Sequence, residues 1–368
     1  MPETEAAPTS SSQANEDEAT TELTKSPPPG KTARVATVQI PTAGDADTSG
    51  EEDGEEEEAS VDDSEILEDL PDDTEEIELI HSRLNSISRL GLQRFGAHLK
   101  KLCLRQNYLS VLDPEVMKAL EGLEELDLYD NKIKRVDESL TTLSKLSVLD
   151  LSFNLLRHVP ETLDHLHSLK TIFFVQNKIS HISGLDGVGA TLRSLELGGN
   201  RLRKIEGLDA LVNLEELWLG KNKITRLENL DALKRLKILS IQSNRITKLE
   251  GLDHLESLEE IYLSHNGIER LEGLEHNNKL RTVDIGNNFV KKLEGISHLS
   301  SLEELWINDN KISTLEDLGS QLKPISSLET VYLEGNPVQK TEGVHYRRKV
   351  ILALPQIKQL DATFVKQV

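Results

Sequence analysis

Leu214-Glu215-Glu216-Leu217-Trp218-Leu219-Gly220-Lys221-Asn222-Lys223-Ile224 is the stretch that decides the fold. Its pattern, LxxLxLxxNxI, returns about every 22 to 24 residues between Leu99 and Val338. A repeat of this period predicts a solenoid, in which each repeat forms one turn. Asparagine marks the ninth position in eleven turns: Asn107, Asn131, Asn154, Asn177, Asn200, Asn222, Asn244, Asn266, Asn288, Asn310 and Asn336.

The pattern is that of the leucine-rich repeat. Side chains alternate between the two faces of a short strand, so positions four and six enter the core. Positions three, five and seven then face outward on the concave side. The asparagine can bond backbone groups that are left unpaired where the chain turns away from the strand. A degenerate turn with Ser82 in the asparagine place precedes Asn107, which brings the solenoid to about twelve turns.

We therefore predict an α/β solenoid with parallel concave strands, 3₁₀ or short helical bends on the convex side, and a helical C-terminal cap. Each turn needs neighbours to bury its leucines, and the terminal turns need caps. The cap helix is predicted from the spacing of Tyr346, Val350, Ile351 and Leu354. The predicted regions are a disordered acidic tail (1–64), an N-terminal cap with the degenerate repeat (65–98), the repeats (99–338) and the C-terminal cap (339–368).

The net charge of −22 belongs almost entirely to the N-terminal segment. Residues 1–76 hold 24 Asp and Glu against three basic residues, whereas the rest holds 40 acidic and 39 basic residues. We expect no basic stripe on the repeats, and hence no nucleic-acid partner. The acidic block from Asp45 to Glu58 has two interpretations: a solvated tail, or an arm that docks on a basic partner or is phosphorylated at Ser49 or Ser60.

The composition also bears on the compartment and on the membrane. Cys103 is the one cysteine, so we expect no disulfide framework and a reducing compartment. The N-terminus has no basic stretch followed by an apolar run, so no secretory signal is expected. No apolar stretch approaches the ~18 residues of a membrane span, so no membrane partner is expected.

Catalysis is not expected. The eleven histidines are scattered over different turns, and none pairs with a cysteine at metal-ligand spacing. No glycine-rich phosphate loop follows a strand. Cys103 lies at an outward strand position without an obvious basic partner, which favours an inert thiol over a nucleophile. We predict that the chain is not an enzyme and needs no metal or cofactor.

Position five of the repeat indicates a binding face instead. Trp and Tyr dominate binding hot spots, and a row of exposed aromatic rings is costly unless a partner covers it. The alternative is that aromatic residues simply favour strands. The position-five column contains both tryptophans of the chain and no Lys or Arg; it consists of Cys103, Asp127, Asp150, Phe173, Glu196, Trp218, Ser240, Tyr262, Asp284, Trp306 and Tyr332.

Across about residues 74–368 the chain resembles the protein phosphatase 1 regulatory subunit 7 family, which are leucine-rich-repeat regulators of type 1 protein phosphatase. The resemblance is carried by LCLRQNYL from Leu102, ELDLYDNKIK from Glu125, YLSHNGIE from Tyr262 and ETVYLEGNPVQK from Glu329. The cap, YRRKVILALPQIKQLDATFV from Tyr346, is the strongest match.

The resemblance implies a non-catalytic subunit that binds the catalytic subunit of type 1 phosphatase along its concave face. It also implies a place in the nucleus and cytoplasm, a link to mitotic dephosphorylation, and a ternary complex with phosphatase inhibitor-3. The family's contact residues match Asp150, Phe173, Glu196, Trp218, Asp284, Trp306 and Tyr332 here, with Glu304 beside them; Asp127 and Tyr262 join the candidate site from the same column.

Two other hypotheses remain open. The chain could be a generic leucine-rich-repeat adaptor for another protein complex, or it could have a purely structural or storage role. Arg34-Val35-Ala36-Thr37 resembles the start of a short docking motif used by phosphatase partners, a basic residue followed by Val-x-Phe/Trp. Thr37 stands where the motif has an aromatic residue, so we do not expect this segment to dock.

Overall fold

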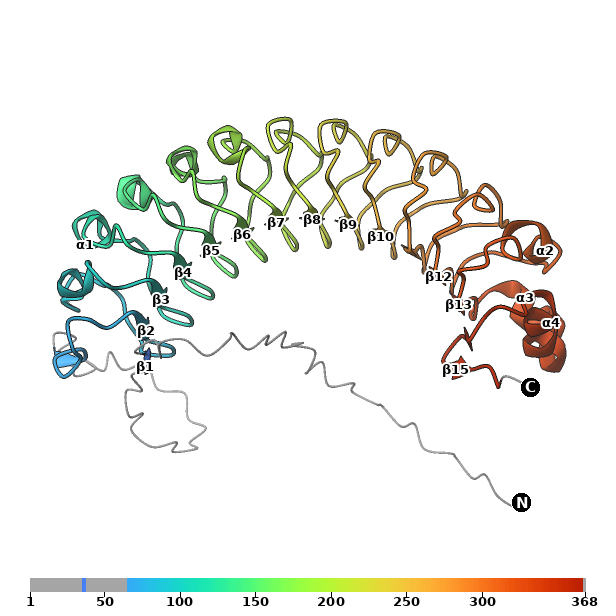
Figure 1. Cartoon of the computed structure of the whole chain (residues 1–368), viewed down its shortest axis with the longest axis horizontal. Helices are drawn as coiled ribbons and strands as arrows, with labels where there is room; N and C mark the ends of the chain where they lie inside the picture. The colour runs from blue at the N-terminus through green and yellow to red at the C-terminus, as the bar shows by residue number, and fades with distance from the viewer. Residues whose placement is uncertain (1–34, 38–64, 367–368) are drawn as a thin grey trace, which may run out of the picture. The chain divides into compact units, whose positions relative to one another are not determined.

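The computed structural model describes residues 35–37 and 65–366, which belong to one compact unit. Disorder is predicted for residues 1–64, and most of this segment lies outside the described residues. The exception is Val35–Thr37, which forms strand β1. Residues 65–366 form an arc with the strands along its inner edge (Figure 1).

The inner edge is a single sheet in which the strands follow one another in chain order. All pairs from β1 to β14 are parallel, and only β14–β15 is antiparallel. The twelve strands β2 to β13 correspond to the eleven asparagine-marked turns and the degenerate turn before them. They are β2 (Glu76–Glu78), β3 (Lys101–Cys103), β4 (Glu125–Asp127), β5 (Val148–Asp150), β6 (Thr171–Phe173), β7 (Ser194–Glu196), β8 (Glu216–Trp218), β9 (Ile238–Ser240), β10 (Glu260–Tyr262), β11 (Thr282–Asp284), β12 (Glu304–Trp306) and β13 (Thr330–Tyr332).

The leucine positions fill one continuous core, as predicted. In β8, for example, the side chains of Leu217 and Leu219 are both 0% exposed. Each buried leucine contributes roughly 1.5–3 kcal/mol of transfer free energy. Because every turn repeats this arrangement, the core runs the length of the arc and holds the concave strands in a fixed register.

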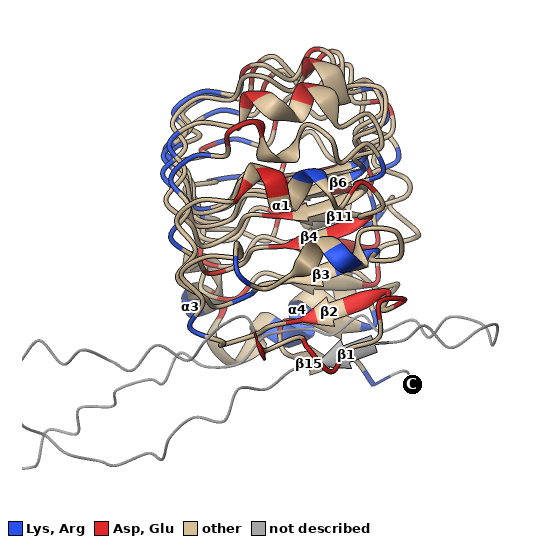
Figure 2. Ribbon diagram, turned by 90° about the vertical axis from the view of Figure 1, so that its left-hand side faces the viewer, with Lys and Arg blue, Asp and Glu red and all other residues tan. Residues whose placement is uncertain are grey.

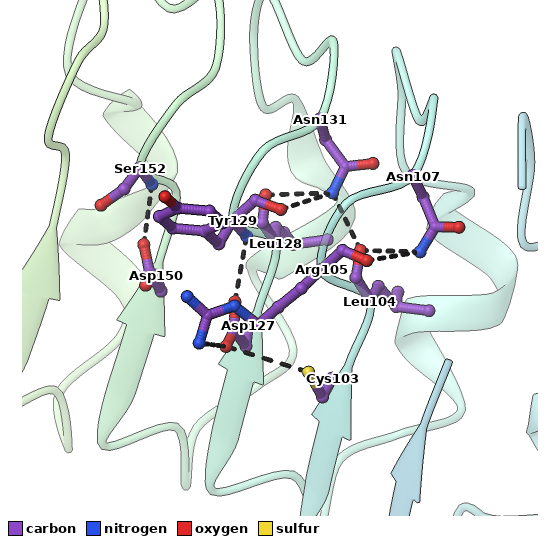
Figure 3. A network of polar contacts seen from close by, with 10 residues as sticks. All are labelled: Cys103, Leu104, Arg105, Asn107, Asp127, Leu128, Tyr129, Asn131, Asp150 and Ser152. Atoms are coloured by element: carbon purple, nitrogen blue, oxygen red, sulfur yellow. Dashed lines mark hydrogen bonds and ion pairs between the residues drawn. The ribbon is translucent and has the colours of Figure 1, made fainter. Parts of the chain in front are cut away.

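The asparagines tie successive turns together, as the pattern predicts. Asn131 donates from Nδ2 to the carbonyls of Leu104, Leu128 and Tyr129 at 2.9, 3.1 and 3.3 Å (Figure 3). Its Oδ1 accepts the backbone N–H of Leu109 at 3.0 Å. One side chain thus satisfies backbone groups of its own turn and of the turn before it, which a buried turn requires.

The convex side carries short helices where the turns are longer. In the 22-residue turns between Asn200 and Asn310 the structure has isolated bonds, such as Leu211 N–H to Leu208 O and Leu214 N–H to Leu211 O, in place of the expected 3₁₀ turn. These bonds are three residues apart, so they form separate reverse turns. The convex helices are η2 (Leu92–Phe95), α1 (Pro114–Lys118), η3 (Glu138–Leu140), η4 (Glu161–His165), η5 (Asp186–Val188) and, in the longer interval between Asn310 and Asn336, α2 (Leu318–Gln321).

The N-terminal end of the core is closed by residues before β2. Leu67 is 1% exposed, and Phe95 is fully buried. Arg94 holds this cap: its guanidinium donates to the carbonyls of Leu67 and Leu70 and lies 4.5 Å from the centre of the Phe95 ring. Strand β1 pairs with β2, which covers the sheet edge that the first repeat would otherwise expose.

The C-terminal cap forms as the helical spacing predicts, with Tyr346 and Val350 of α4 buried against the last turn. Asp361 takes the place of the next asparagine, and its Oδ1 accepts the N–H groups of Leu333 and Glu334 at 2.8 and 3.0 Å. The hydroxyl of Tyr346 donates to Asp361 Oδ2 at 3.1 Å. The cap consists of α3 (Pro337–Glu342), η6 (Gly343–His345), α4 (Tyr346–Ala353), β14 (Gln359–Leu360) and β15 (Thr363–Phe364).

Candidate partner-binding face

The position-five residues form one column along the concave face, because the strands pair in register. Trp218 lies beside Ser240, which lies beside Tyr262. The same register continues from Asp284 through Trp306 to the last strand of the repeats. The structure therefore aligns the predicted position-five residues in one column.

Aromatic rings dominate the C-terminal half of this column. The rings of Trp218 and Tyr262 stack across the intervening strand, with centroids 6.4 Å apart and an interplanar angle of 19°. Trp306 and Tyr332 are neighbours, with centroids 5.3 Å apart at 55°. Trp306 is 36% exposed, so a large indole surface remains open to solvent. Two aromatic pairs thus present apolar surface on adjacent parts of the face.

Hydrogen bonds fix the polar ends of these rings. The indole N–H of Trp306 donates to Glu304 Oε2 at 3.1 Å, and the Tyr262 hydroxyl donates to Glu260 Oε2 at 2.7 Å. Burial, followed by the Glu260 hydrogen bond, raises the pKa of Tyr262, so this hydroxyl stays protonated and remains a donor. Tyr332 accepts a hydrogen bond from Gln359 of the cap at 2.7 Å. The rings are oriented before any partner arrives.

Two members of the column do not face water, which contradicts the expectation for position five. Ser240 is 3% exposed because the stacked rings of Trp218 and Tyr262 lie over it. Asp284 is 4% exposed between the larger side chains of Tyr262 and Trp306. Its carboxylate accepts from the Gly286 N–H at 3.0 Å. Its other oxygen accepts from Gln242 Nε2 at 3.4 Å, so the printed hydrogen bonds of Asp284 are made within the protein.

Carboxyl groups dominate the N-terminal half of the column. Burial raises the pKa of Asp127 to about 6, and the charge of Asp150 acts in the same direction. Burial also raises the pKa values of Asp150 and Glu196. Each aspartate accepts a backbone N–H two residues on, at 3.0 Å for Asp127 and 2.7 Å for Asp150 (Figure 3). Burial therefore disfavours the charged form of these carboxyl groups at neutral pH, and the guanidinium of Arg105, 3.5 Å from Asp127 Oδ2, only partly offsets this.

Cys103 begins this acidic half. Its thiol donates to Asp127 Oδ2 at 3.9 Å, and burial raises its pKa to about 11. A thiol with such a pKa is almost fully protonated near neutral pH and is a poor nucleophile. Among residues 35–37 and 65–366 no group of His, Cys, Asp and Glu could hold a metal ion. In the same residues no helix has the length and apolarity to cross a membrane.

We expect Asp127→Asn to stabilise the free protein at neutral pH and not at acid pH. A carboxyl whose folded-state pKa lies above its unfolded value costs stability as the pH rises from about 4 to about 6. The variant should exceed wild type by about 1–3 kcal/mol in free energy of unfolding near pH 7.5, because one pKa unit corresponds to ~1.4 kcal/mol. The asparagine oxygen can still accept the Tyr129 N–H. Urea unfolding at acid and neutral pH measures the difference.

Asp253→Asn is the control for this measurement, since Asp253 is exposed and forms no hydrogen bond or ion pair in the described structure. It should follow the pH profile of wild type. A gain for Asp127→Asn that is equally large at pH ~4 would contradict the assignment, because the charge penalty is absent once the wild-type carboxyl is protonated.

The structure adds aromatic residues that the column did not include. Tyr129 and Phe153, at positions seven and eight of their turns, have ring centroids 4.8 Å apart, and the guanidinium of Arg105 lies 4.3 Å from the Tyr129 ring. Phe153 is 41% exposed and lines a shallow hollow that also contains Glu196 and Trp218. The sequence feature that could have indicated these two residues is an aromatic side chain at position seven or eight, just before the asparagine.

One flank of the arc contradicts the expectation that the repeats carry no basic stripe. Residues that follow the asparagines in consecutive turns, such as Arg201, Lys223 and Arg245, lie in register on this flank. Figure 2 shows Lys and Arg in blue along the left edge of the stacked turns, the side on which α3 lies. The cations are about one repeat apart in the sequence, so only the stacking of turns aligns them.

Three family models match the chain. A leucine-rich-repeat model matches residues 97–156 and 212–268, a second matches residues 252–368, and a two-copy model matches residues 190–232. Internalin InlF from Listeria monocytogenes has a similar structure, with a TM-score of 0.61, 21% identity, and coverage of 83% of this chain and 89% of that chain. This likeness concerns the fold alone.

Curated relatives carry more specific names. The chain is 47% identical to protein phosphatase 1 regulatory subunit SDS22 of Saccharomyces cerevisiae over 83 residues, which are 23% of this chain and 24% of that protein. It is 63% identical to human protein phosphatase 1 regulatory subunit 7 over 46 residues, 12% of each chain. The matched stretches span about a quarter or less of the length of these relatives.

Proposed function

Because the chain belongs to the leucine-rich-repeat family of protein phosphatase 1 regulatory subunits, we propose that it is a non-catalytic subunit that binds the catalytic subunit of type 1 Ser/Thr protein phosphatase through its concave face. One observation carries the proposal: half-exposed aromatic rings and destabilised carboxyl groups occupy a single column on that face.

The aromatic half supplies anchoring surface. Trp218, Trp306 and Tyr332 present rings that are already held by ring contacts or hydrogen bonds. Oriented side chains lose little conformational entropy when a partner covers them. Tryptophan and tyrosine are also the residue types in which binding free energy concentrates. A globular partner with apolar projections fits this half.

The acidic half supplies charge complementarity. Burial raises the pKa values of Asp127, Asp150 and Glu196, and neighbouring acids add to the rise at Asp127 and Glu196. A Lys or Arg of the partner would lower these pKa values and remove the repulsion. Binding should therefore remove the free-energy cost of keeping these carboxyl groups ionised in the free protein. The part of the partner that lies opposite β4 to β7 should accordingly be basic.

In this proposal the arc provides a rigid concave surface that holds the partner. Twelve parallel strands about 4.8 Å apart give an inner edge of roughly 50 Å, which can hold one side of a folded domain. Such a contact controls the location, availability or substrate choice of the phosphatase without chemistry by the subunit. Mitotic dephosphorylation, a nuclear and cytoplasmic place, and a ternary complex with inhibitor-3 extend this proposal; they rest on the resemblance.

Calorimetric titration of the full chain into purified type 1 phosphatase catalytic subunit tests the proposal. We expect stoichiometric, submicromolar binding and no phosphatase turnover by the chain alone. A folded chain that does not bind would overturn the phosphatase assignment and favour the generic adaptor. Turnover by the chain alone would overturn its non-catalytic role.

A further inference from the structure

The flank that follows the asparagines carries a basic stripe across four consecutive turns. We define the basic flank as Lys178, Arg201, Arg203, Lys204, Lys223 and Arg245. Arg201, Lys223 and Arg245 each donate a backbone N–H to the preceding turn at 2.8 Å, so their side chains start one turn apart. Adjacent turns are about 4.8 Å apart at the strands, so like charges are held close together.

These cations are unpaired. In the part of the chain that the structure describes, none of the six side chains forms an ion pair or a hydrogen bond, and four of the six residues are exposed. Other cations beyond the asparagines are paired, both in these turns and in later ones. Arg226 pairs with Glu250 at 3.2 Å, and Arg270 pairs with Glu294 at 2.9 Å. Carboxylates thus neutralise these neighbouring arginines, whereas the six cations of the basic flank have no carboxylate partner among the described residues.

The same chain contains the complementary charge. The acidic segment Asp45–Asp63 holds eleven Asp and Glu residues and no Lys or Arg. It lies outside the described residues and ends just before Glu65, where the N-terminal cap begins. The concave face is itself acidic and would repel this segment, whereas the basic flank would attract it.

The linking chain is long enough. Strand β1 pairs with β2, and the cap that begins at Glu65 precedes β2, so the described residues on both sides of 38–64 belong to the N-terminal end of the arc. At about 3.3–3.6 Å per residue, the middle of such a segment reaches roughly 45 Å from its ends. Four strand steps from β2 to β6 cover roughly 19 Å, and seven steps to β9 cover roughly 34 Å. The basic flank lies within this range.

We propose that the basic flank binds the acidic segment Asp45–Asp63 of the same chain. Because the two are linked, the effective concentration of the segment near the flank is on the order of millimolar. A nucleic acid is a poorer occupant, since the flank positions after the asparagines of these four turns (178–183, 201–206, 223–228 and 245–250) contain no Phe, Tyr or Trp on which bases could stack. The contact leaves the concave face free, so it is independent of phosphatase binding.

Zero-length carbodiimide crosslinking of the full chain, followed by peptide mass spectrometry, tests the contact. Glu51–Glu58 should crosslink to Lys178, Lys204 or Lys223 several-fold more often than to Lys234, an exposed lysine elsewhere on the solenoid. The preference should not depend on protein concentration and should disappear at high salt. Equal crosslinking to Lys234, or crosslinks only between chains, would overturn the proposal.

A labelled decaglutamate peptide provides a second measurement. It should bind the E55Q/E56Q/E57Q/E58Q chain several-fold more tightly than wild type, because the basic flank is then less occupied. Adding R201E/R203E/K204E should abolish this binding, whereas the matched K234E/R235E change should not. Equal binding to wild type and to the neutralised chain would show an unoccupied flank and overturn the proposal. Tight binding of a short DNA duplex to wild type would overturn it in favour of a nucleic-acid surface.

Discussion

Trp218→Ala and Trp306→Ala together are expected to weaken binding to the type 1 phosphatase catalytic subunit by at least about 4 kcal/mol, roughly a thousandfold in Kd. Each substitution removes a large ring from the aromatic half of the column. Strands β8 and β12 are four steps apart, about 19 Å, so the two losses should add. Calorimetry of wild type, both single variants and the double variant gives the individual terms.

The fold should survive these changes, because neither ring belongs to the leucine core. Trp218→Ala loses its stacking with Tyr262 and should cost about 1 kcal/mol of stability. Phe289→Ala is the matched control: Phe289 is 48% exposed, follows the ninth-position asparagine and lies outside the position-five column. It should leave Kd unchanged. An unaltered affinity in the double variant, or an equal loss in the control, would show that the aromatic column is not the anchor.

The main features of the repeat could be predicted because each depends on local spacing. Leu217 and Leu219 are buried wherever a strand stacks between neighbours, and Asn222 lies where the chain leaves the strand. Both facts follow from the alternation of a strand and the need to satisfy buried backbone groups. No information about distant residues is needed.

The features that were missed depend on residues brought together from different turns. Ser240 is buried because two rings from neighbouring strands meet over it. The raised pKa of Asp127 depends on burial and on Asp150 in the next turn. The basic flank depends on cations that are about one repeat apart in the chain. Sequence spacing places each residue on its own turn, whereas the sizes and charges of its neighbours decide exposure and pKa.

Asn222→Ala is expected to lower the free energy of unfolding by about 3–5 kcal/mol, since a buried unpaired group costs about 1–3 kcal/mol and a lost hydrogen bond about 1 kcal/mol. Asn222 Oδ1 accepts the N–H of Leu202 at 3.0 Å, and its Nδ2 donates to the carbonyls of Leu197 and Leu219 at 2.9 and 3.0 Å. The substitution therefore removes one acceptor and the donors that join two turns. Urea unfolding followed by circular dichroism measures the loss.

Two further variants separate the effect of the hydrogen bonds between turns from a general effect of removing an asparagine. Asn278→Ala should be neutral within about 0.5 kcal/mol, because Asn278 is exposed and forms no hydrogen bond in the described structure. Asn222→Asp keeps an acceptor for the Leu202 N–H but turns a carboxylate toward carbonyl oxygens, so it should be as harmful as alanine at neutral pH. Asp361 tolerates the same position in the cap because N–H groups and the Tyr346 hydroxyl surround it. Full stability of Asn222→Asp would mean that the amide donors are dispensable and that the side-chain oxygen, which accepts the Leu202 N–H, is enough to join the two turns.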